Sequence, residues 1–220
     1  PAAWAELAKV PCVLEKRMEL DFEVSALVVR GYDDAVVAYP VSQNIHRDGI
    51  LHTSTVPAPS LKPAQEKKIV EAAKALIRKI DYVGVLCVEF FVLKNGDIVA
   101  NEIAPRPHNS GHYTMDACVS SQFEQQVRTM ARLPLGDTRQ LAPVSMLNLL
   151  GDLWFEGNEE HPKEPAWNKV LAHPDAKLHL YGKSAPRMGR KMGHINCLGE
   201  AINEARQNCA AVATELGIEP

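Results

Sequence analysis

The 220-residue sequence lacks the features that define several large classes of protein. It contains no run of 18 apolar residues, which a helix needs to cross a bilayer, so we do not expect a membrane protein. Its net charge of −3 gives no overall basic field, so nucleic acid is not an expected partner. It also has no CxxC spacing, no Ser/His/Asp order and no Rossmann fingerprint. Zinc, hydrolase and dinucleotide sites therefore have no support.

Cysteine is scarce and scattered. The chain has five cysteines, an odd number, and most lie among apolar residues: Cys12, Cys87, Cys118, Cys197 and Cys209. Such a set predicts reduced thiols in a cytoplasmic protein rather than a disulfide framework. The chain begins at Pro1 without an initiating Met or a signal-peptide pattern, so we expect a piece of a longer protein.

The residue patterns predict a mixed α+β fold. A composition of 46% hydrophobic and 23% charged residues is ordinary for a globular protein. β-Branched and alternating stretches predict strands, whereas helical periodicity predicts helices, the first opened by Pro63. The expected strands lie in 13–30, 35–46, 83–93, 98–103, 144–150 and 176–183. The expected helices are 63–80, 115–133 and 199–216, and the expected loops include 54–63 and 156–165.

A hairpin around Asn95 and Gly96 is predicted to set two glutamates against each other. An Asn-Gly pair between apolar runs favours a two-residue type I′ turn. In that register the numbers of paired residues sum to 191, which places Glu89 opposite Glu102 on one face. Their Cβ atoms would then lie about 4.5–5.5 Å apart.

Two carboxylates in that position need an explanation, because like charges that face each other are unfavourable. A divalent cation could bridge them, and Mg²⁺ is suited to one or two carboxylates plus phosphate oxygens. Alternatively, one glutamate is protonated or the face is solvated. The apolar residues around Glu89 and Glu102 favour the metal. Calcium is disfavoured, because it wants six to eight oxygen ligands.

Two basic segments follow the hairpin. "APRPHNSGH" carries Arg106, His108 and His112 on a backbone restricted by Pro105 and Pro107, which is typical of a fixed loop at a sheet edge. "YGKSAPRMGRKMGH" carries four basic residues, Lys183, Arg187, Arg190 and Lys191, but lacks the spacing of a P-loop. Either segment could also be a solvated surface loop.

The segments "VGVLCVEFFVLKNGDIVANEIAPRPHNSGH", "VLEKRMELDFEVSALVVR" and "LHLYGKSAPRMGRKMGHI" resemble the ATP-grasp enzymes. Within that superfamily they are most similar to the N5-carboxyaminoimidazole ribonucleotide synthetases of purine biosynthesis, through nearly the whole chain. The resemblance implies a partial ATP-grasp core in residues 1–139, with an antiparallel sheet and flanking helices. It also implies a small α/β, barrel-sandwich-like subdomain in residues 140–220.

The resemblance implies a ligase reaction with ATP, bicarbonate and 5-aminoimidazole ribonucleotide as substrates. The products are ADP, phosphate and the N5-carbamate, formed through carboxyphosphate, and Mg²⁺ is the implied cofactor. The family tends to form homodimers. Its upstream domain and glycine-rich phosphate loop have no counterpart in these 220 residues, so we expect the chain alone to be inactive or nearly so, and to bind nucleotide weakly.

The resemblance also implies a role for individual residues. Glu89 and Glu102 correspond to metal ligands, and Asn101 and Glu102 to a nucleotide-binding pair. The general ATP-grasp pattern has an Asn where this chain has Ala104, so no third protein ligand is expected. The remaining nucleotide contacts would come from an adenine linker, a ribose-binding carboxylate and a histidine: Glu15, Lys16, Arg17 and Met18, then Glu23, then His46. Without the resemblance, these would be surface charges and a structural histidine.

For the second substrate, the resemblance places Arg106 and His108 beside the aminoimidazole ribonucleotide and carboxyphosphate as catalytic residues. Lys183 and Arg190 would hold the 5′-phosphate, while Arg187 and Lys191 receive no role. Two alternatives remain open. One is a different ATP-grasp ligase, such as a glycinamide ribonucleotide synthetase or a biotin carboxylase. The other is a non-catalytic nucleotide-binding domain that keeps the fold.

Overall fold

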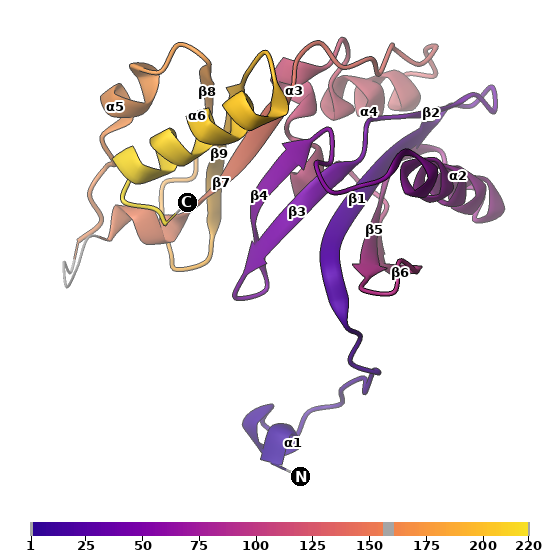
Figure 1. Cartoon of the computed structure of the whole chain (residues 1–220), viewed down its shortest axis with the longest axis horizontal. Helices are drawn as coiled ribbons and strands as arrows, with labels where there is room; N and C mark the ends of the chain where they lie inside the picture. The colour runs from indigo at the N-terminus through magenta and orange to yellow at the C-terminus, as the bar shows by residue number, and fades with distance from the viewer. Residues whose placement is uncertain (1, 156–160, 220) are drawn as a thin grey trace.

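The structure, a computed structural model, describes residues 2–155 and 161–219, and one antiparallel sheet dominates it (Figure 1). Within these residues the sheet has nine strands in the order β6-β5-β1-β3-β4-β7-β9-β8, and β2 pairs with β1. The strands are β1 (Leu20–Arg30), β2 (Val36–Ala38), β3 (Ser42–Arg47), β4 (Ile50–Val56), β5 (Gly84–Leu93), β6 (Ile98–Ala104), β7 (Val144–Leu150), β8 (Ala176–Leu180) and β9 (Lys191–Leu198).

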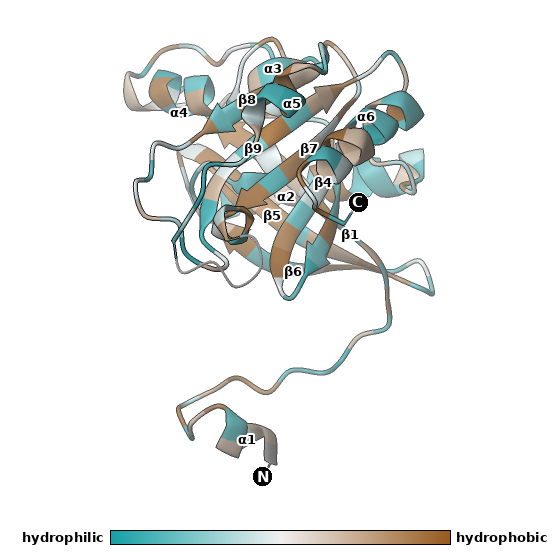
Figure 2. Cartoon of the chain, turned by 90° about the vertical axis from the view of Figure 1, so that its left-hand side faces the viewer, coloured by the Kyte–Doolittle hydropathy of each residue, from teal (hydrophilic) through white to brown (hydrophobic). Residues whose placement is uncertain are grey.

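The described part of the chain also contains six α-helices and two short 3₁₀ helices. They are α1 (Ala2–Glu6), α2 (Pro63–Lys79), η1 (Asn109–Gly111), α3 (Thr114–Ala117), α4 (Gln122–Met130), η2 (Gly151–Trp154), α5 (Trp167–Leu171) and α6 (Ile202–Glu215). α1 lies at the end of an N-terminal arm that extends away from the sheet (Figures 1 and 2). None of the helices in residues 2–155 and 161–219 has the length and apolar character needed to span a bilayer.

The expected α+β class and antiparallel sheet are confirmed, but several element boundaries were wrong. Residues 13–19 are not a strand, β4 continues to Val56 and β8 ends at Leu180. β9 was missed, because its first residues looked like part of a basic, glycine-containing loop. Of the loop expected at 156–165, residues 156–160 lie outside the described part of the chain.

The helix expected at 115–133 is broken into α3 and α4. Cys118 leaves the helical conformation and forms an isolated bridge with Gln140. Ser121 then starts α4, since its side-chain oxygen accepts a hydrogen bond from the Glu124 amide at 3.1 Å. Such a serine cap favours a new helix start over continuation of the old one.

The two faces of the sheet are covered differently. On one face, alternate residues of β1 such as Val24 and Val28 pack against Ile69 and Ile77 of α2. Farther along the same face, α6 covers β7 and β9. On the opposite face, Leu27 packs against Tyr113, which belongs to the segment after β6. Each fully buried aliphatic side chain contributes roughly 1.5–3 kcal/mol by removing apolar surface from water.

The sheet is continuous from β6 to β8, because β4 pairs with β7 from Thr53↔Leu147 to Val56↔Val144. The C-terminal strands β7, β9 and β8 therefore extend the sheet formed by β1 to β6. This arrangement places residues from both halves of the chain on the face opposite α2 and α6, where the predicted site residues gather.

Candidate active site

Glu89 and Glu102 lie directly opposite each other on β5 and β6, as predicted. The route to this pairing differs from the prediction, because the hairpin does not have a two-residue type I′ turn. Next to the turn, the residue numbers of paired residues sum to 190 instead of 191, for example in Val92↔Ile98. Asn101 is an extra residue in β6, and beyond this bulge the sum becomes 191. Bulges of this kind commonly aim side chains near active sites.

The two glutamates form a candidate metal centre, and His108 lies beside it. One ligand atom from each of the three residues lies within 4.8 Å of the others. The Glu89 side chain is 14% exposed, and burial followed by the nearby Glu102 raises the pKa of its carboxyl group. Two close carboxylates with an open side toward a cavity fit Mg²⁺, which takes few protein oxygens and keeps waters or phosphates as its other ligands.

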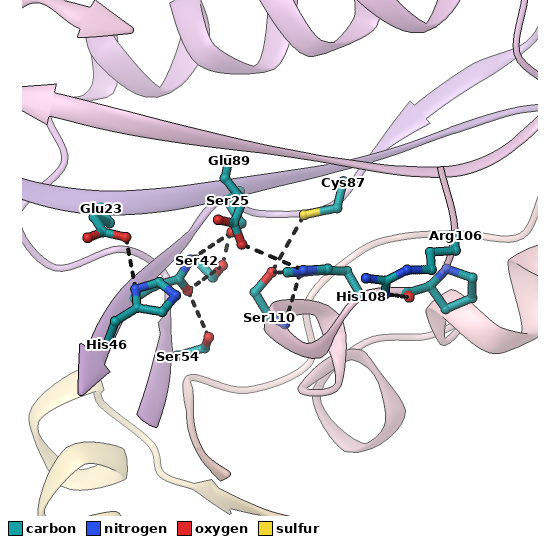
Figure 3. Close-up of polar contacts among 12 residues, drawn as sticks. Glu23, Ser25, Ser42, His46, Ser54, Cys87, Glu89, Arg106, His108 and Ser110 are labelled. Atoms are coloured by element: carbon teal, nitrogen blue, oxygen red, sulfur yellow. Dashed lines mark hydrogen bonds and ion pairs between the residues drawn. The ribbon is translucent and has the colours of Figure 1, made fainter. Parts of the chain in front are cut away.

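His108 is fixed in a neutral form beside Glu89. Its Nδ1 accepts a hydrogen bond from the Ser110 amide at 3.4 Å, which leaves the proton on Nε2, 3.6 Å from Glu89 Oε1 (Figure 3). Burial, and then the nearby Arg106, lower the pKa of His108 to about 4. The buried Gln122 bonds both to the His108 amide and to its carbonyl at 2.8 Å. His108 can therefore donate one hydrogen bond from a fixed position.

Glu23 and His46 form a second polar pair on the same face. Glu23 Oε2 lies 2.8 Å from His46 Nδ1, and this contact raises the pKa of His46 (Figure 3). On the neighbouring strands, Asn44 Nδ2 donates to Ser25 Oγ at 2.7 Å, and Ser54 Oγ donates to Asn44 Oδ1 at 2.8 Å. These buried hydrogen bonds stabilise the strands that carry the pair, because each polar group has a partner.

The glutamate pair, His108 and the Glu23–His46 pair line one cavity of about 360 Å³. It brings together six residues predicted for the site: Glu23, His46, Glu89, Asn101, Glu102 and His108. Its other lining residues are Gly49, Ile50, Leu51, Phe91 and Lys191. The prediction had not assigned Phe91 or Lys191. Phe91 had no distinguishing signal in the sequence, whereas Lys191 was visible as one of four basic residues.

The predicted adenine linker lies beside this cavity but does not line it. Glu15, Lys16, Arg17 and Met18 form the wall of a neighbouring open hollow of about 910 Å³, together with Glu19, Leu20, Phe91 and Lys94. Phe91 lines both spaces, so the hollow and the cavity are neighbours. The linker has no regular secondary structure, and the Lys94 amide donates to the Glu19 carbonyl at 3.2 Å.

The predicted substrate-binding cations lie at the edge of the site, outside the cavity lining. Arg106 is exposed, and its Nη1 donates to the Pro107 carbonyl at 3.0 Å. Lys183 donates to the Lys191 carbonyl at 2.5 Å, while Arg190 donates to the Ala185 carbonyl at 2.6 Å. Lys183 and Arg190 therefore hold the backbone of their own loop in this structure.

The comparisons with known proteins divide the chain into two matches. The ATP-grasp domain family matches residues 1–123. The phosphoribosylaminoimidazole carboxylase C-terminal domain family matches residues 144–208. The first match covers more than half of the chain and includes β1 to β6, which carry both glutamates, and the following segment with His108.

The similar proteins point to one enzyme family. N5-carboxyaminoimidazole ribonucleotide synthase of Brucella melitensis is 46% identical over 194 residues, which are 88% of this chain and 50% of that protein. The Bacillus subtilis synthase is 43% identical over 193 residues, 88% of this chain and 48% of that protein. The chain thus spans about half the length of the curated relatives it matches.

Solved structures agree with this relationship. The Thermus thermophilus N5-carboxyaminoimidazole ribonucleotide synthetase has a TM-score of 0.88 and 37% identity, and the match covers all of this chain and 57% of that one. An Aspergillus clavatus synthase, solved with ADP and 5-aminoimidazole ribonucleotide, has a TM-score of 0.82 and 32% identity, covering 92% of this chain and 53% of that one. The chain belongs to the ATP-grasp family and, within it, to the N5-carboxyaminoimidazole ribonucleotide synthases.

Proposed function

We propose that the protein containing this chain carboxylates 5-aminoimidazole ribonucleotide with bicarbonate, using ATP. The observation that carries the proposal is the cavity whose lining combines the carboxylates Glu89 and Glu102 with His108 and Lys191. Carboxylates can hold a metal-bound nucleotide, while cations can hold the acids that react with it. The family relationship supports this choice, since a related synthase was solved with ADP and 5-aminoimidazole ribonucleotide.

For the nucleotide, we propose that Glu89 and Glu102 bind Mg²⁺ and that the metal's remaining positions take ATP phosphates. When bound, Mg²⁺ supplies the positive charge that stabilises a phosphoryl group in transfer. Glu23, held by His46, faces the same cavity and can accept hydrogen bonds from ribose hydroxyls. The backbone of 15–18, in the hollow beyond Phe91, can supply the hydrogen bonds that adenine needs.

The reaction then consists of two transfers. First, a bicarbonate oxygen forms a bond to the γ-phosphorus of ATP, the bond from that phosphorus to the β–γ bridging oxygen breaks, and ADP leaves with the electron pair. The product is carboxyphosphate. Second, the amine nitrogen of the ribonucleotide bonds to the carboxyl carbon, the bond from that carbon to the phosphate oxygen breaks, and phosphate leaves. The amine gives up one proton, which the departing phosphate can accept.

For these steps we propose that His108 and Arg106 orient the acid. His108 is neutral at pH 7, so its Nε2–H can donate to an oxygen of the reacting carboxyl group. Arg106 carries a planar, bidentate guanidinium that suits carboxylates and phosphates. Lys183 and Arg190 lie near Lys191 in the sequence, and each donates a hydrogen bond to a backbone carbonyl. When the ribonucleotide binds, these side chains would donate to its 5′-phosphate instead.

The test is ATP-dependent phosphate release by a full-length protein that contains this chain, with a panel of amine substrates. We expect release that depends on both bicarbonate and 5-aminoimidazole ribonucleotide, with one carbamate formed per phosphate. Activity with glycinamide ribonucleotide or biotin instead would identify another ATP-grasp ligase. No turnover with any of the substrates, combined with tight nucleotide binding, would support the non-catalytic alternative.

The 220-residue chain should be measured in parallel. It spans about half the length of its relatives, so we expect it to release phosphate at least about 100-fold more slowly than the full-length protein, a loss of about 2.7 kcal/mol of transition-state stabilisation. Equal activity of the two proteins would show that these 220 residues contain the complete catalytic site.

A further inference from the structure

Three histidine rings and a tyrosine ring contact one another outside the cavity lining, and the proposed function gives them no role. His194 stacks on both His112 and His179, with ring centroids 4.6 Å apart in each pair and ring planes inclined by 23° and 18°. The hydroxyl of Tyr181 lies 2.9 Å from His194 Nδ1. These four residues, His112, His179, Tyr181 and His194, are called the ring cluster below.

The ring cluster joins two parts of the chain that start from opposite edges of the sheet. β6 and β8 are the two edge strands of the described sheet, with six strands between them (Figure 1). The segment after β6 returns across the sheet, because Asn196 of β9 donates to the His112 carbonyl at 3.1 Å. His112 thereby meets His194 of β9 and Tyr181, which directly follows β8.

Each end of the ring cluster contacts a group connected with one of the proposed substrate sites. Lys183, which is proposed to hold the 5′-phosphate, has its Nζ 5.4 Å from the centroid of the Tyr181 ring. His112 Nδ1 lies 3.0 Å from Nε2 of Gln122, which also donates to the His108 carbonyl at 2.8 Å. A continuous path of side-chain contacts therefore runs from the phosphate-binding loop to His108.

The rings of this path are uncharged and fixed in place. Burial, followed by the neighbouring histidines, lowers the pKa of His112 to about 3 and that of His194 to about 2, so both are neutral at pH 7. His179 Nε2 lies 2.8 Å from Asp116 Oδ2, which also accepts from Asn196 at 2.6 Å. Neutral rings held by hydrogen bonds at their edges can keep two elements at a fixed separation.

We propose that the ring cluster is a positioning device, with Tyr181 as its principal residue, that sets the separation between the 5′-phosphate site and His108. This inference rests on the proposed function and concerns the geometry of its second transfer. In that transfer the amine nitrogen must meet the carboxyl carbon, and a displacement of about 1 Å can slow such a step by about 100-fold. The first transfer, from ATP to bicarbonate, involves no atom of the ribonucleotide.

Loss of this positioning should uncouple the two transfers. Carboxyphosphate that meets no amine breaks the bond from its carbon to the phosphate oxygen, releases CO₂ and passes its carboxyl proton to the phosphate. ATP is then consumed without formation of the carbamate. Partial unfolding would lower both products in the same proportion, so the amount of carbamate formed per phosphate separates a positioning role from a purely structural one.

The experiment measures this ratio in the full-length protein with ¹⁴C-bicarbonate, for the wild type and for Tyr181→Phe, which keeps the ring and removes the hydroxyl. The wild type should form about one carbamate per phosphate. Tyr181→Phe should lower the ratio about threefold or more, while the KM values for ATP and bicarbonate change by less than about twofold. His112→Phe should lower the ratio as well. The double variant should be no worse than the poorer single variant, because both residues act through one path.

Tyr32→Phe is the matched control, since Tyr32 is an exposed tyrosine whose ring also lies near a cation, Arg132, at 4.7 Å. It should leave the ratio unchanged. A ratio of about one in Tyr181→Phe, or losses that multiply in the double variant, would overturn the inference. If Tyr181→Phe does not fold, His112→Phe supplies the same comparison with the same two outcomes. A wild-type protein that forms no carbamate from the ribonucleotide would instead overturn the proposed function.

Discussion

Glu89 and Glu102 face each other across β5 and β6 because one residue, Asn101, has no partner in β5. The turn between the strands has three residues, with a hydrogen bond between the Leu93 amide and the Asp97 carbonyl at 2.9 Å. A three-residue turn without a bulge would place Asn101 opposite Glu89 and direct Glu102 to the other face. The bulge therefore brings both carboxylates to the cavity.

The carboxylate pair makes the first prediction. Glu89→Gln or Glu102→Gln in the full-length protein should weaken Mg²⁺-dependent binding of an ATP analogue by at least about tenfold, because each variant removes one charge from the proposed metal centre. Without metal, Glu89→Gln should unfold at the same or a higher denaturant concentration, since burial and Glu102 disfavour the charged form of Glu89. Calorimetric titration with and without Mg²⁺, and urea unfolding, measure the two effects.

Glu71→Gln is the control for these variants, because Glu71 is an exposed glutamate of α2 whose ion pair with Lys74 spans 3.2 Å. It should affect neither nucleotide binding nor the metal requirement. Equal Mg²⁺-dependent affinity in wild type, Glu89→Gln and Glu102→Gln would exclude the metal centre.

The turn makes the second prediction. Gly96 has a φ of +88° and nothing within 4 Å of the position of a Cβ atom, so replacement acts through the backbone alone. Gly96→Ala should lower the free energy of unfolding by about 1–2 kcal/mol. Gly96→Asn should cost less, because asparagine tolerates the left-handed region. Urea denaturation of the three proteins checks this order, and equal stability of all three would contradict the turn geometry.

The two cavity histidines should titrate far apart. Hydrogen bonding to Glu23 raises the pKa of His46 above its ordinary value of 6.5, whereas burial lowers the pKa of His108 to about 4. The pH dependence of their NMR chemical shifts should therefore show His46 protonated and His108 neutral near pH 6. Coincident titration of the two rings near pH 6.5 would contradict the contacts described for both.

The raised pKa of His46 also predicts how this residue affects the free energy of unfolding. A histidine whose folded pKa is raised stabilises the protein fully below its unfolded pKa of about 6.5 and loses this contribution as the pH rises through the folded pKa. His46→Gln should thus be less stable than wild type at pH 6, and the difference should shrink at pH 9. Urea unfolding at the two pH values measures it, and a difference that grows with pH would show the opposite linkage.

Gln122 makes a further prediction as a positioning residue. It is fully buried and bonds to the His108 amide, to the His108 carbonyl and to the His112 ring, at 2.8, 2.8 and 3.0 Å. Gln122→Met should lower the free energy of unfolding by about 1–3 kcal/mol, because it leaves buried backbone groups without partners. It should also lower kcat, since His108 is no longer held beside Glu89.

Gln207→Met is the matched control for Gln122→Met, because Gln207 is an exposed helical glutamine of α6. It should change stability by no more than about 0.5 kcal/mol. If Gln122→Met were as stable and as active as this control, the hydrogen bonds of Gln122 would have no role in positioning His108.

The sequence predicted the sheet and the main helices, because hydrophobic alternation and helical periodicity act locally. It also placed Glu89 opposite Glu102, but through a two-residue turn that the structure does not have. It did not predict the bulges. A bulge adds a single residue at Asn101, His52 or Met192, and no local pattern separates it from a regular strand. Lys191 was consequently left without a role, since its face depends on Met192. The break at Cys118 also depends on a distant partner, Gln140.

The most direct test of the account follows the oxygen atoms of bicarbonate. The full-length protein is supplied with ¹⁸O-labelled bicarbonate, ATP, Mg²⁺ and 5-aminoimidazole ribonucleotide, and the phosphate product is analysed by mass spectrometry before bicarbonate exchanges with water. If bicarbonate attacks the γ-phosphorus beside Glu89 and Glu102, each phosphate released will carry one labelled oxygen. Carbamate formation with unlabelled phosphate would mean that water, and not bicarbonate, receives the phosphoryl group, and would contradict the proposed reaction.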